Sequence, residues 1–165
     1  MNLTQPQLVT LKANINAEID PTFVGYRSTG QTGAMANWYN VDSSFIVYKP
    51  RVPTLDIGAA VNYVAVEAMV AASQNALSLF YTMNPSDFAP TRSDQRSYLG
   101  NTFSGALGGQ GQASRDALEA LYRRPALRGE KVYVTGTGTT VAPGALDATA
   151  NGQMTNQNIL DALAA

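Results

Sequence analysis

The sequence predicts a mainly α-helical protein: a small helical bundle with a short β-hairpin or extended arm near the C-terminus. Three observations support this fold class. Apolar residues recur at helical spacing near the N-terminus, segment 54–83 is long and nearly free of charge, and stretch 133–150 is rich in Thr, Gly and Ala with little periodicity. We therefore expect a helical domain over 1–130, and an extended β-arm with a short terminal helix over 131–165.

The first helix is expected over about 4–19. Thr4 can cap it, and Gln7 stands three residues later, which is the spacing of a capping box. Apolar residues recur on one face of this helix: Leu8, Leu11, Ile15 and Ile19. Asp20 and Pro21 are expected to end it.

The middle of the chain contains a predicted short helix at 34–39 and a predicted strand at 45–49, where β-branched and aromatic residues gather. Segment 54–83 has strongly helical composition, and Glu67 is its one charged residue after position 58. Its length would suit a membrane span, but several polar residues interrupt it. A central buried helix or helix pair is therefore expected, with no membrane partner.

A further helix is expected over 91–103, with Tyr98 and Leu99 as core contacts. The glycine-rich segment 104–112 is predicted to be a flexible loop and is the clearest break in the chain. Ser114 is then expected to cap a helix that Pro125 kinks or ends.

The segment after that helix is expected to form a strand at 131–135, although a continued helix before Gly136 stays open. Gly136 and Gly138 lie in a Gly-Thr-Gly-Thr-Thr run that lacks the lysine of a P-loop and the third glycine of a dinucleotide fingerprint. We interpret both glycines as hinge or turn positions and expect no nucleotide and no other cofactor. A last short helix is expected from Thr155.

Composition excludes several function classes. The 165-residue chain has no Cys and no His, so disulfides, thiolate sites and Ser-His-Asp triads are impossible. Its net charge of −1 argues against a dedicated nucleic-acid binder, which needs surplus cations. Only 14% of residues are charged, below the roughly 25% of typical soluble domains, and such a surface is poorly protected against association. The N-terminus lacks the pattern of a signal peptide.

Two sets of charged residues could carry a function. One is a basic cluster that could face a neighbouring subunit or passing DNA: Arg123, Arg124, Arg128 and Lys131. Helix-end charge and a solvated face explain this cluster equally well. The other set is acidic: Glu67 or Asp94 with an arginine could serve an enzyme without histidine, although a structural role for Glu67 in the core or at a subunit contact is favoured.

The C-terminal segment 123–163 resembles that of a family of small virion proteins of tailed bacteriophages. The resemblance rests on the order of Arg128-Gly129-Glu130-Lys131, an apolar run, Gly136-Thr137-Gly138-Thr139, Pro143 and a final short helix. The opening LTQPQLVTLKANINAEID is similar to the family's first helix. The Tyr39-Asn40 pair with the following aromatic run resembles its middle.

This resemblance implies a non-enzymatic structural protein of the virion, assembled in the cytoplasm of a bacterial host. A head-to-tail connector or adaptor, forming a homo-oligomeric ring on the portal with neighbouring neck and tail proteins, is the expected role. Non-specific contact with packaged DNA is a further expectation. The alternatives are another virion component, such as a tail-end, tail-completion or capsid-associated protein, and less favourably the enzyme that would use Glu67.

Overall fold

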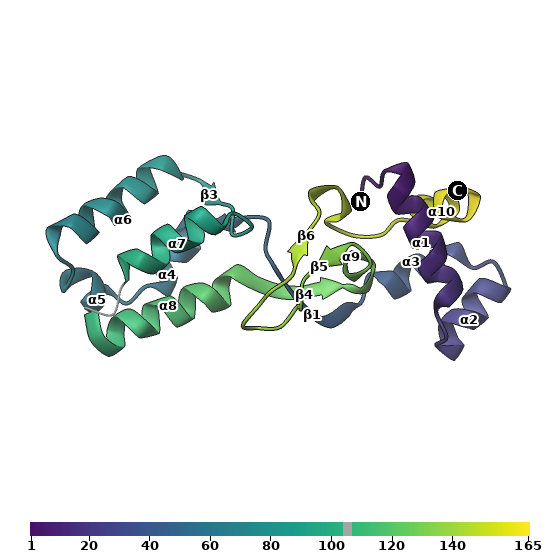
Figure 1. Cartoon of the computed structure of the whole chain (residues 1–165), viewed down its shortest axis with the longest axis horizontal. Helices are drawn as coiled ribbons and strands as arrows, with labels where there is room; N and C mark the ends of the chain where they lie inside the picture. The colour runs from purple at the N-terminus through teal and green to yellow at the C-terminus, as the bar shows by residue number, and fades with distance from the viewer. Residues whose placement is uncertain (104–106) are drawn as a thin grey trace. The chain divides into compact units, whose positions relative to one another are not determined.

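A computed structural model of the chain describes residues 1–103 and 107–165. The protein is mainly helical with short strand pairs (Figure 1), which confirms the predicted fold class. Contacts divide the chain into two compact units. Unit 1 contains Met1–Val47 and Pro125–Ala165, and unit 2 contains Tyr48–Arg124. The chain therefore passes between the units twice, and neither crossing is the predicted boundary after residue 130.

Unit 1 joins the two ends of the sequence. Its helices are α1 (Gln5–Ala17), α2 (Pro21–Ser28), α3 (Thr32–Tyr39), α9 (Arg128–Lys131), α10 (Asn156–Ala164) and a 3-10 turn at Ala148–Ala150. Helix α10 packs on both α1 and α3. The core of the unit is formed mainly by apolar side chains of these helices: Leu11, Ile15, Phe23, Met35, Tyr39 and Ile159.

The first helix confirms its predicted start. The Gln7 side chain accepts a hydrogen bond from the Thr4 amide at 2.8 Å, so one free donor at the helix N-terminus is satisfied. The predicted end at Ile19 was wrong, because α1 stops at Ala17 and Ile19 is 86% exposed. Asp20 accepts from the Thr22 amide at 2.9 Å and caps α2, a helix that the sequence analysis missed.

Two strand pairs lie wholly or mostly in unit 1. Strand β1 (Asp42–Tyr48) pairs with β4 (Arg123–Leu127), and β5 (Val134–Thr135) pairs antiparallel with β6 (Ala145–Leu146). The predicted strand at 131–135 is thus partly helical, since Lys131 ends α9, and the predicted hairpin is the β5–β6 pair.

Unit 2 consists of helices around one core and a two-residue antiparallel strand pair. Its elements are β2 (Val52–Pro53), α4 (Thr54–Ala60), α5 (Tyr63–Glu67), α6 (Ala71–Met83), β3 (Asp87–Phe88), α7 (Ser93–Thr102) and α8 (Gly108–Tyr122). The predicted helix or helix pair over 54–83 is therefore three helices. Asn62 explains the first break, because its side chain accepts from the Val64 amide at 2.9 Å and so caps α5.

Helix α8 corrects two predictions. It begins at Gly108, so 108–112 is helical rather than a loop, and 104–106 lies outside the described residues. Ser114 does not cap the helix. It is 1% exposed within α8, and its hydroxyl oxygen accepts from the Asn62 amide at 3.0 Å. Of the two core contacts predicted in α7, Leu99 is buried and Tyr98 is 38% exposed.

Candidate functional site

The four residues of the predicted basic cluster divide between the units. Arg123 and Arg124 lie at the end of unit 2, and Arg123 forms an ion pair with Glu119 one helical turn earlier. Arg128 and Lys131 belong to α9 in unit 1. The Arg128 guanidinium lies over the Trp38 ring, 3.9 Å from its centre, while Lys131 is exposed.

Arg128 and Lys131 line an open cleft of unit 1 with a volume of about 620 Å³. Its walls come from the α1–α2 corner, α3, the start of β1, and α9. The lining residues are Asn14, Glu18, Asp20, Trp38, Tyr39, Asp42, Ser43, Ser44, Arg128, Lys131 and Val132. The cleft carries carboxylates and cations together, so it is suited to a polar partner segment with charges of both signs rather than to a uniformly anionic one.

Backbone amides bond to one oxygen of each of two of the three carboxylates. Glu18 accepts hydrogen bonds from the Ile19 and Asp20 amides at 3.0 and 3.1 Å, and Asp20 caps α2. At the floor, the Tyr39 hydroxyl donates to Asn14 Oδ1 at 2.9 Å. Burial, with the negative charge of Glu18 as a second cause, raises the pKa of Tyr39 far above its ordinary value. Tyr39 is therefore a fixed neutral donor in this wall.

Gly136 and Gly138 lie in the loop between β5 and β6. Both have positive φ, 96° and 64°, a conformation that favours glycine, so the structure agrees with turn positions. Gly138 O accepts from the Ile46 amide at 2.7 Å, and a methyl group at Gly138 would overlap the Phe45 ring. The loop of the predicted extended arm therefore lies against β1 of its own unit.

Glu130 is a charged residue whose burial the sequence did not indicate. Its position in the sequence suggests one more charge within the basic cluster, yet its side chain is fully buried. Its carboxylate accepts from the Leu127 amide at 2.9 Å and from the Gly152 amide at 2.8 Å. The local signal was a carboxylate at the third position of a helix, which can cap the chain before it. The hydrogen bond from the Gly152 amide joins residues far apart in the sequence, so no local pattern predicts it.

Glu67, the residue proposed for an enzyme, is exposed at the end of α5. The enclosed carboxylate that this hypothesis needs is not found at that position. Asp94 is also exposed and pairs with Arg92, whose hydrogen bonds lower the pKa of Asp94. In the described part of the chain, no group of acidic residues is arranged to hold a metal ion.

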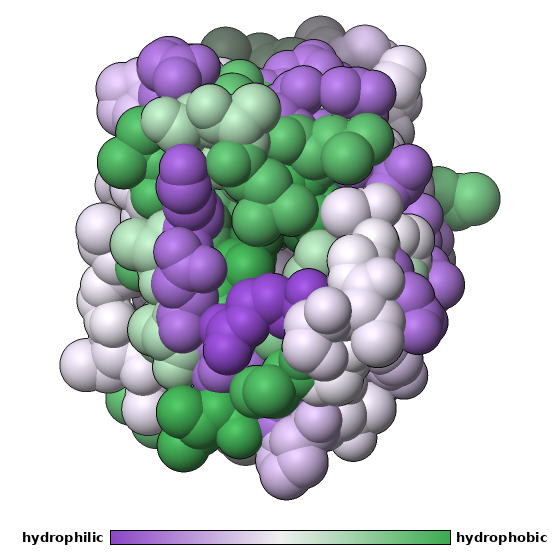
Figure 2. All heavy atoms as spheres, turned by 90° about the vertical axis from the view of Figure 1, so that its right-hand side faces the viewer, coloured by the Kyte–Doolittle hydropathy of each residue, from purple (hydrophilic) through white to green (hydrophobic). Residues whose placement is uncertain are grey.

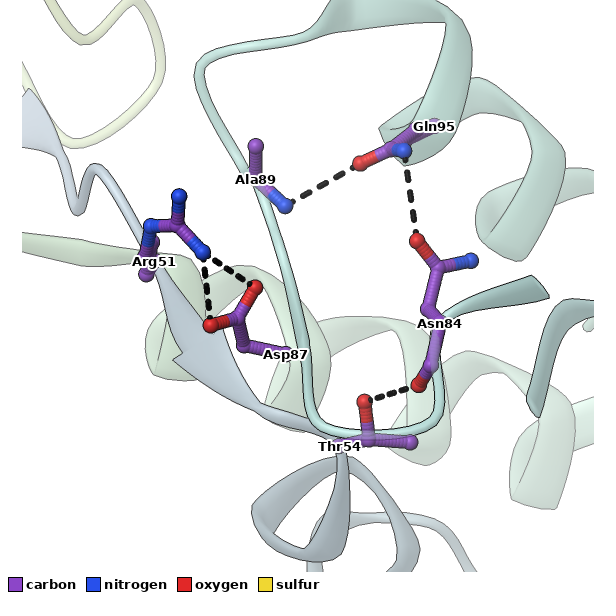
Figure 3. Close-up of polar contacts among 6 residues, drawn as sticks. All are labelled: Arg51, Thr54, Asn84, Asp87, Ala89 and Gln95. Carbon is purple, nitrogen blue, oxygen red and sulfur yellow. Dashed lines mark hydrogen bonds and ion pairs between the residues drawn. The ribbon is translucent and has the colours of Figure 1, made fainter. Parts of the chain in front are cut away.

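A second cavity lies between α6 and α7 in unit 2 and has a volume of about 450 Å³. Met83 and Tyr98 give it an apolar, exposed wall. Asn84 and Gln95 form its polar wall, and Figure 3 shows how they are fixed: Gln95 donates to Asn84 Oδ1 at 3.4 Å and accepts from the Ala89 amide at 3.0 Å. The loop that forms this wall of the groove is therefore held in place by hydrogen bonds of Gln95.

Further side chains hold the same loop from its other side. The Thr54 hydroxyl donates to the Asn84 carbonyl at 2.6 Å, and Arg51 forms a two-point ion pair with Asp87 at 2.9 and 2.8 Å (Figure 3). The segment from Asn84 to Ala89 is thus held by the side chain of Arg51, which precedes β2, and by side chains from α4 and α7. The wall it gives to the groove is expected to be rigid.

Apolar side chains are also exposed on unit 1. Val9 of α1 and Leu160 and Leu163 of α10 are examples. Figure 2 shows a face of this unit on which apolar residues lie in several places, with polar residues between them. Scattered apolar residues of this kind are ordinary on a protein surface.

None of the helices in the described ranges is long and apolar enough to span a membrane. Comparison with known protein families, curated proteins and solved structures finds no match for this chain.

Proposed function

We propose that this chain is a structural virion protein of a tailed bacteriophage, a head-to-tail connector or adaptor subunit that assembles as a ring on the portal. The resemblance of segment 123–163 gives the class of protein. The observation that supports assembly is the surface of helices α4 to α6 in unit 2. This surface combines exposed apolar side chains with almost no charge.

The exposed apolar side chains of this surface are large. They are Leu55, Tyr63, Val64, Val70, Leu79 and Met83. Leu55, Tyr63 and Met83 expose 84, 72 and 72% of their area. Helix α6 contains no charged residue. Association surfaces are depleted of charge in their centres and enriched in aromatic residues and Met, so this composition supports contact with another protein.

Leu79 and Met83 form the centre of the proposed contact. They lie one turn apart on α6 and therefore share a face. Met83 also lines the groove that Tyr98 walls, so the apolar face continues into a cavity that can receive a partner side chain. A ring repeats such a modest contact at every subunit, which multiplies its contribution.

The cleft of unit 1 supports a second contact. It offers Arg128 and Lys131 on one side and Glu18, Asp20 and Asp42 on the other. A neighbouring neck or tail protein could be selected by complementary charges there, since such charges contribute more to specificity than to affinity.

The test is a measurement of mass by light scattering after size-exclusion chromatography, for the chain alone and mixed with purified portal. The proposal expects a ring-sized oligomer or a complex with the portal. A chain that stays monomeric and has no affinity for the portal would refute it. Imaging of the assembled particle then distinguishes the neck from a tail-end or capsid position.

A matched pair of variants locates the contact. Replacing Leu79 and Met83 together with Glu should abolish assembly while the helical circular dichroism is retained, because buried unpaired charges disfavour association. Val141→Glu is the control: Val141 is 89% exposed but lies in unit 1, outside the proposed surface. Equal loss of assembly in both variants would contradict the assignment to α6.

A further inference from the structure

A small cavity of about 40 Å³ lies in unit 2 along α7 and α8. Arg96 and Gly100 line it from α7, one helical turn apart. Helix α8 contributes the rest of the described lining at helical spacing: Arg115, Leu118, Glu119 and Tyr122. None of these residues belongs to the apolar surface of α4–α6 or to the cleft of unit 1.

Tyr122 presents an unusual group to this cavity. Its side chain is 3% exposed, and within the described residues its hydroxyl has no hydrogen-bond partner. Buried hydroxyl groups nearly always have a partner, so this one calls for an explanation. Burial raises the pKa of Tyr122 far above its ordinary value, and the group therefore stays protonated and able to donate at neutral pH.

Two guanidinium groups stand at the same cavity. Arg115 donates to the Phe103 carbonyl at 2.8 Å and to the Gln112 side-chain oxygen. The Arg96 guanidinium donates to the Pro90 carbonyl and lies 3.9 Å from the centre of the Tyr48 ring. Each guanidinium has five N–H donors and stays charged at any ordinary pH, so donors remain after these contacts.

Among the described residues, the only carboxylate that lines the cavity belongs to Glu119, and Arg123 forms an ion pair with it. The two lining arginines therefore leave the cavity with a positive balance. Positive charge, several donors and a buried hydroxyl without a described partner are together the chemistry of an anion site.

We propose that this cavity binds a small oxyanion of the size of inorganic phosphate. The volume has room for a few water-sized groups, which matches one tetrahedral oxyanion. A phosphodiester of DNA shares this chemistry but carries two ester substituents that would have to fit as well, so the free ion is the ligand assigned. This inference does not depend on the proposed virion role.

The experiment compares the melting temperature of the whole chain in millimolar sodium phosphate and in sodium chloride of equal ionic strength. A ligand at ten times its dissociation constant should raise the melting temperature of a chain of this size by about 3–5 °C. Arg96→Gln and Tyr122→Phe should remove most of this phosphate-dependent rise. Arg92→Gln is the matched control, because Arg92 is an exposed guanidinium next to the same helix but outside the cavity.

Two variants separate binding from folding. Tyr122→Phe removes a hydroxyl that has no partner among the described residues, so its melting temperature without phosphate should equal or exceed that of the wild type. At Gly100, a methyl group would meet no atom within 4 Å, and alanine is the better helix former. Gly100→Ala should therefore melt at a higher temperature without phosphate. Its melting temperature should respond less to phosphate, because the added methyl group takes up space at the cavity that Gly100 lines.

The proposal is overturned if phosphate gives the wild type no rise over chloride, or if Tyr122→Phe and Gly100→Ala respond as the wild type does. A short DNA duplex is tested beside free phosphate. A rise that only the duplex produces, and that requires Tyr122, would overturn the assignment to the free ion.

Discussion

Replacing Glu130 with Gln is the sharpest test of the fold of unit 1. The carboxylate of Glu130 is fully buried and accepts one hydrogen bond from the Leu127 amide and another from the Gly152 amide. Glutamine has nearly the same shape but offers one oxygen and one NH₂ group. At least one backbone N–H would therefore face a donor instead of an acceptor.

The cost follows from these two contacts. Hydrogen bonds to a charged group contribute about 1.5–3 kcal/mol each, and a buried donor left without a partner costs about 1–3 kcal/mol. We expect Glu130→Gln to lower the free energy of unfolding of unit 1 by about 3 kcal/mol. A domain has only about 5–15 kcal/mol of stability in total, so this loss should be plain in a denaturation curve.

The assay uses the single tryptophan of the chain. Trp38 lies in unit 1, so its fluorescence during urea unfolding reports on that unit, while far-ultraviolet circular dichroism follows both units. Glu67→Gln is the control, because the same substitution at an exposed glutamate should change stability by less than about 0.5 kcal/mol. If the two variants unfold at the same urea concentration, Glu130 does not hold the chain through these two hydrogen bonds.

Three further predictions concern other contacts. Gly138→Ala should lower the melting temperature by several degrees, because φ is +64° and the methyl group meets an aromatic ring, whereas Gly33→Ala has open space and should not lower it. Stability should fall as pH rises above about 10, since the raised pKa values of Tyr39, Tyr122 and Tyr133 mean that only the unfolded chain ionises these groups there. The free energy of unfolding from urea titrations should therefore be lower above this pH than below it, and an unchanged value would contradict the reasoning. Asn40→Ala should cost about 2 kcal/mol in the urea assay, because its amide both donates to and accepts from the backbone before α10 at 2.8 and 2.6 Å; a change below about 0.5 kcal/mol would contradict this.

The elements predicted well are those whose signals are local. Thr4 and Gln7 mark the start of α1, and Thr155 caps α10 by accepting from the Asn158 amide at 3.1 Å. Caps and apolar spacing depend on residues within one or two turns of each other, so a single sequence contains them. The turn at Gly136 and Gly138 belongs to the same class, since a positive φ is a property of the glycine itself.

Helix α8 shows why other elements could not be predicted. Its buried stripe is Gly111, Ser114, Leu118 and Tyr122, which has helical spacing but begins with two small residues. Glycine disfavours helix by about 1 kcal/mol, so local propensity favours a loop. Packing of this stripe against neighbouring helices compensates, as the Asn62 amide on the Ser114 hydroxyl illustrates. That compensation comes from a residue far away in the sequence.

The same distinction governs the candidate sites. Arg128, Glu130 and Lys131 are close in sequence and form one charged run, but the fold separates their roles. Glu130 is turned inward to two backbone amides, Arg128 stacks on an aromatic ring, and Lys131 stays at the cleft. The charges counted along this segment therefore differ from those that a partner meets at the surface, because Glu130 is buried and Arg128 lies against a ring.

Buried polar groups inform on the fold when they have a partner and on a ligand when they have none. The side chains of Glu130 and Asn40 have partners within their own unit, so they explain the fold and need no ligand. The Tyr122 hydroxyl has none among the described residues, yet it lies at a cavity with two arginines. Arg96 and Arg115 were absent from every sequence-based hypothesis because they belong to different helices and are separated by more than a dozen residues. In a chain with few charges, two arginines of different helices that line one cavity with a buried hydroxyl are better evidence for a ligand than four cations close together in the sequence.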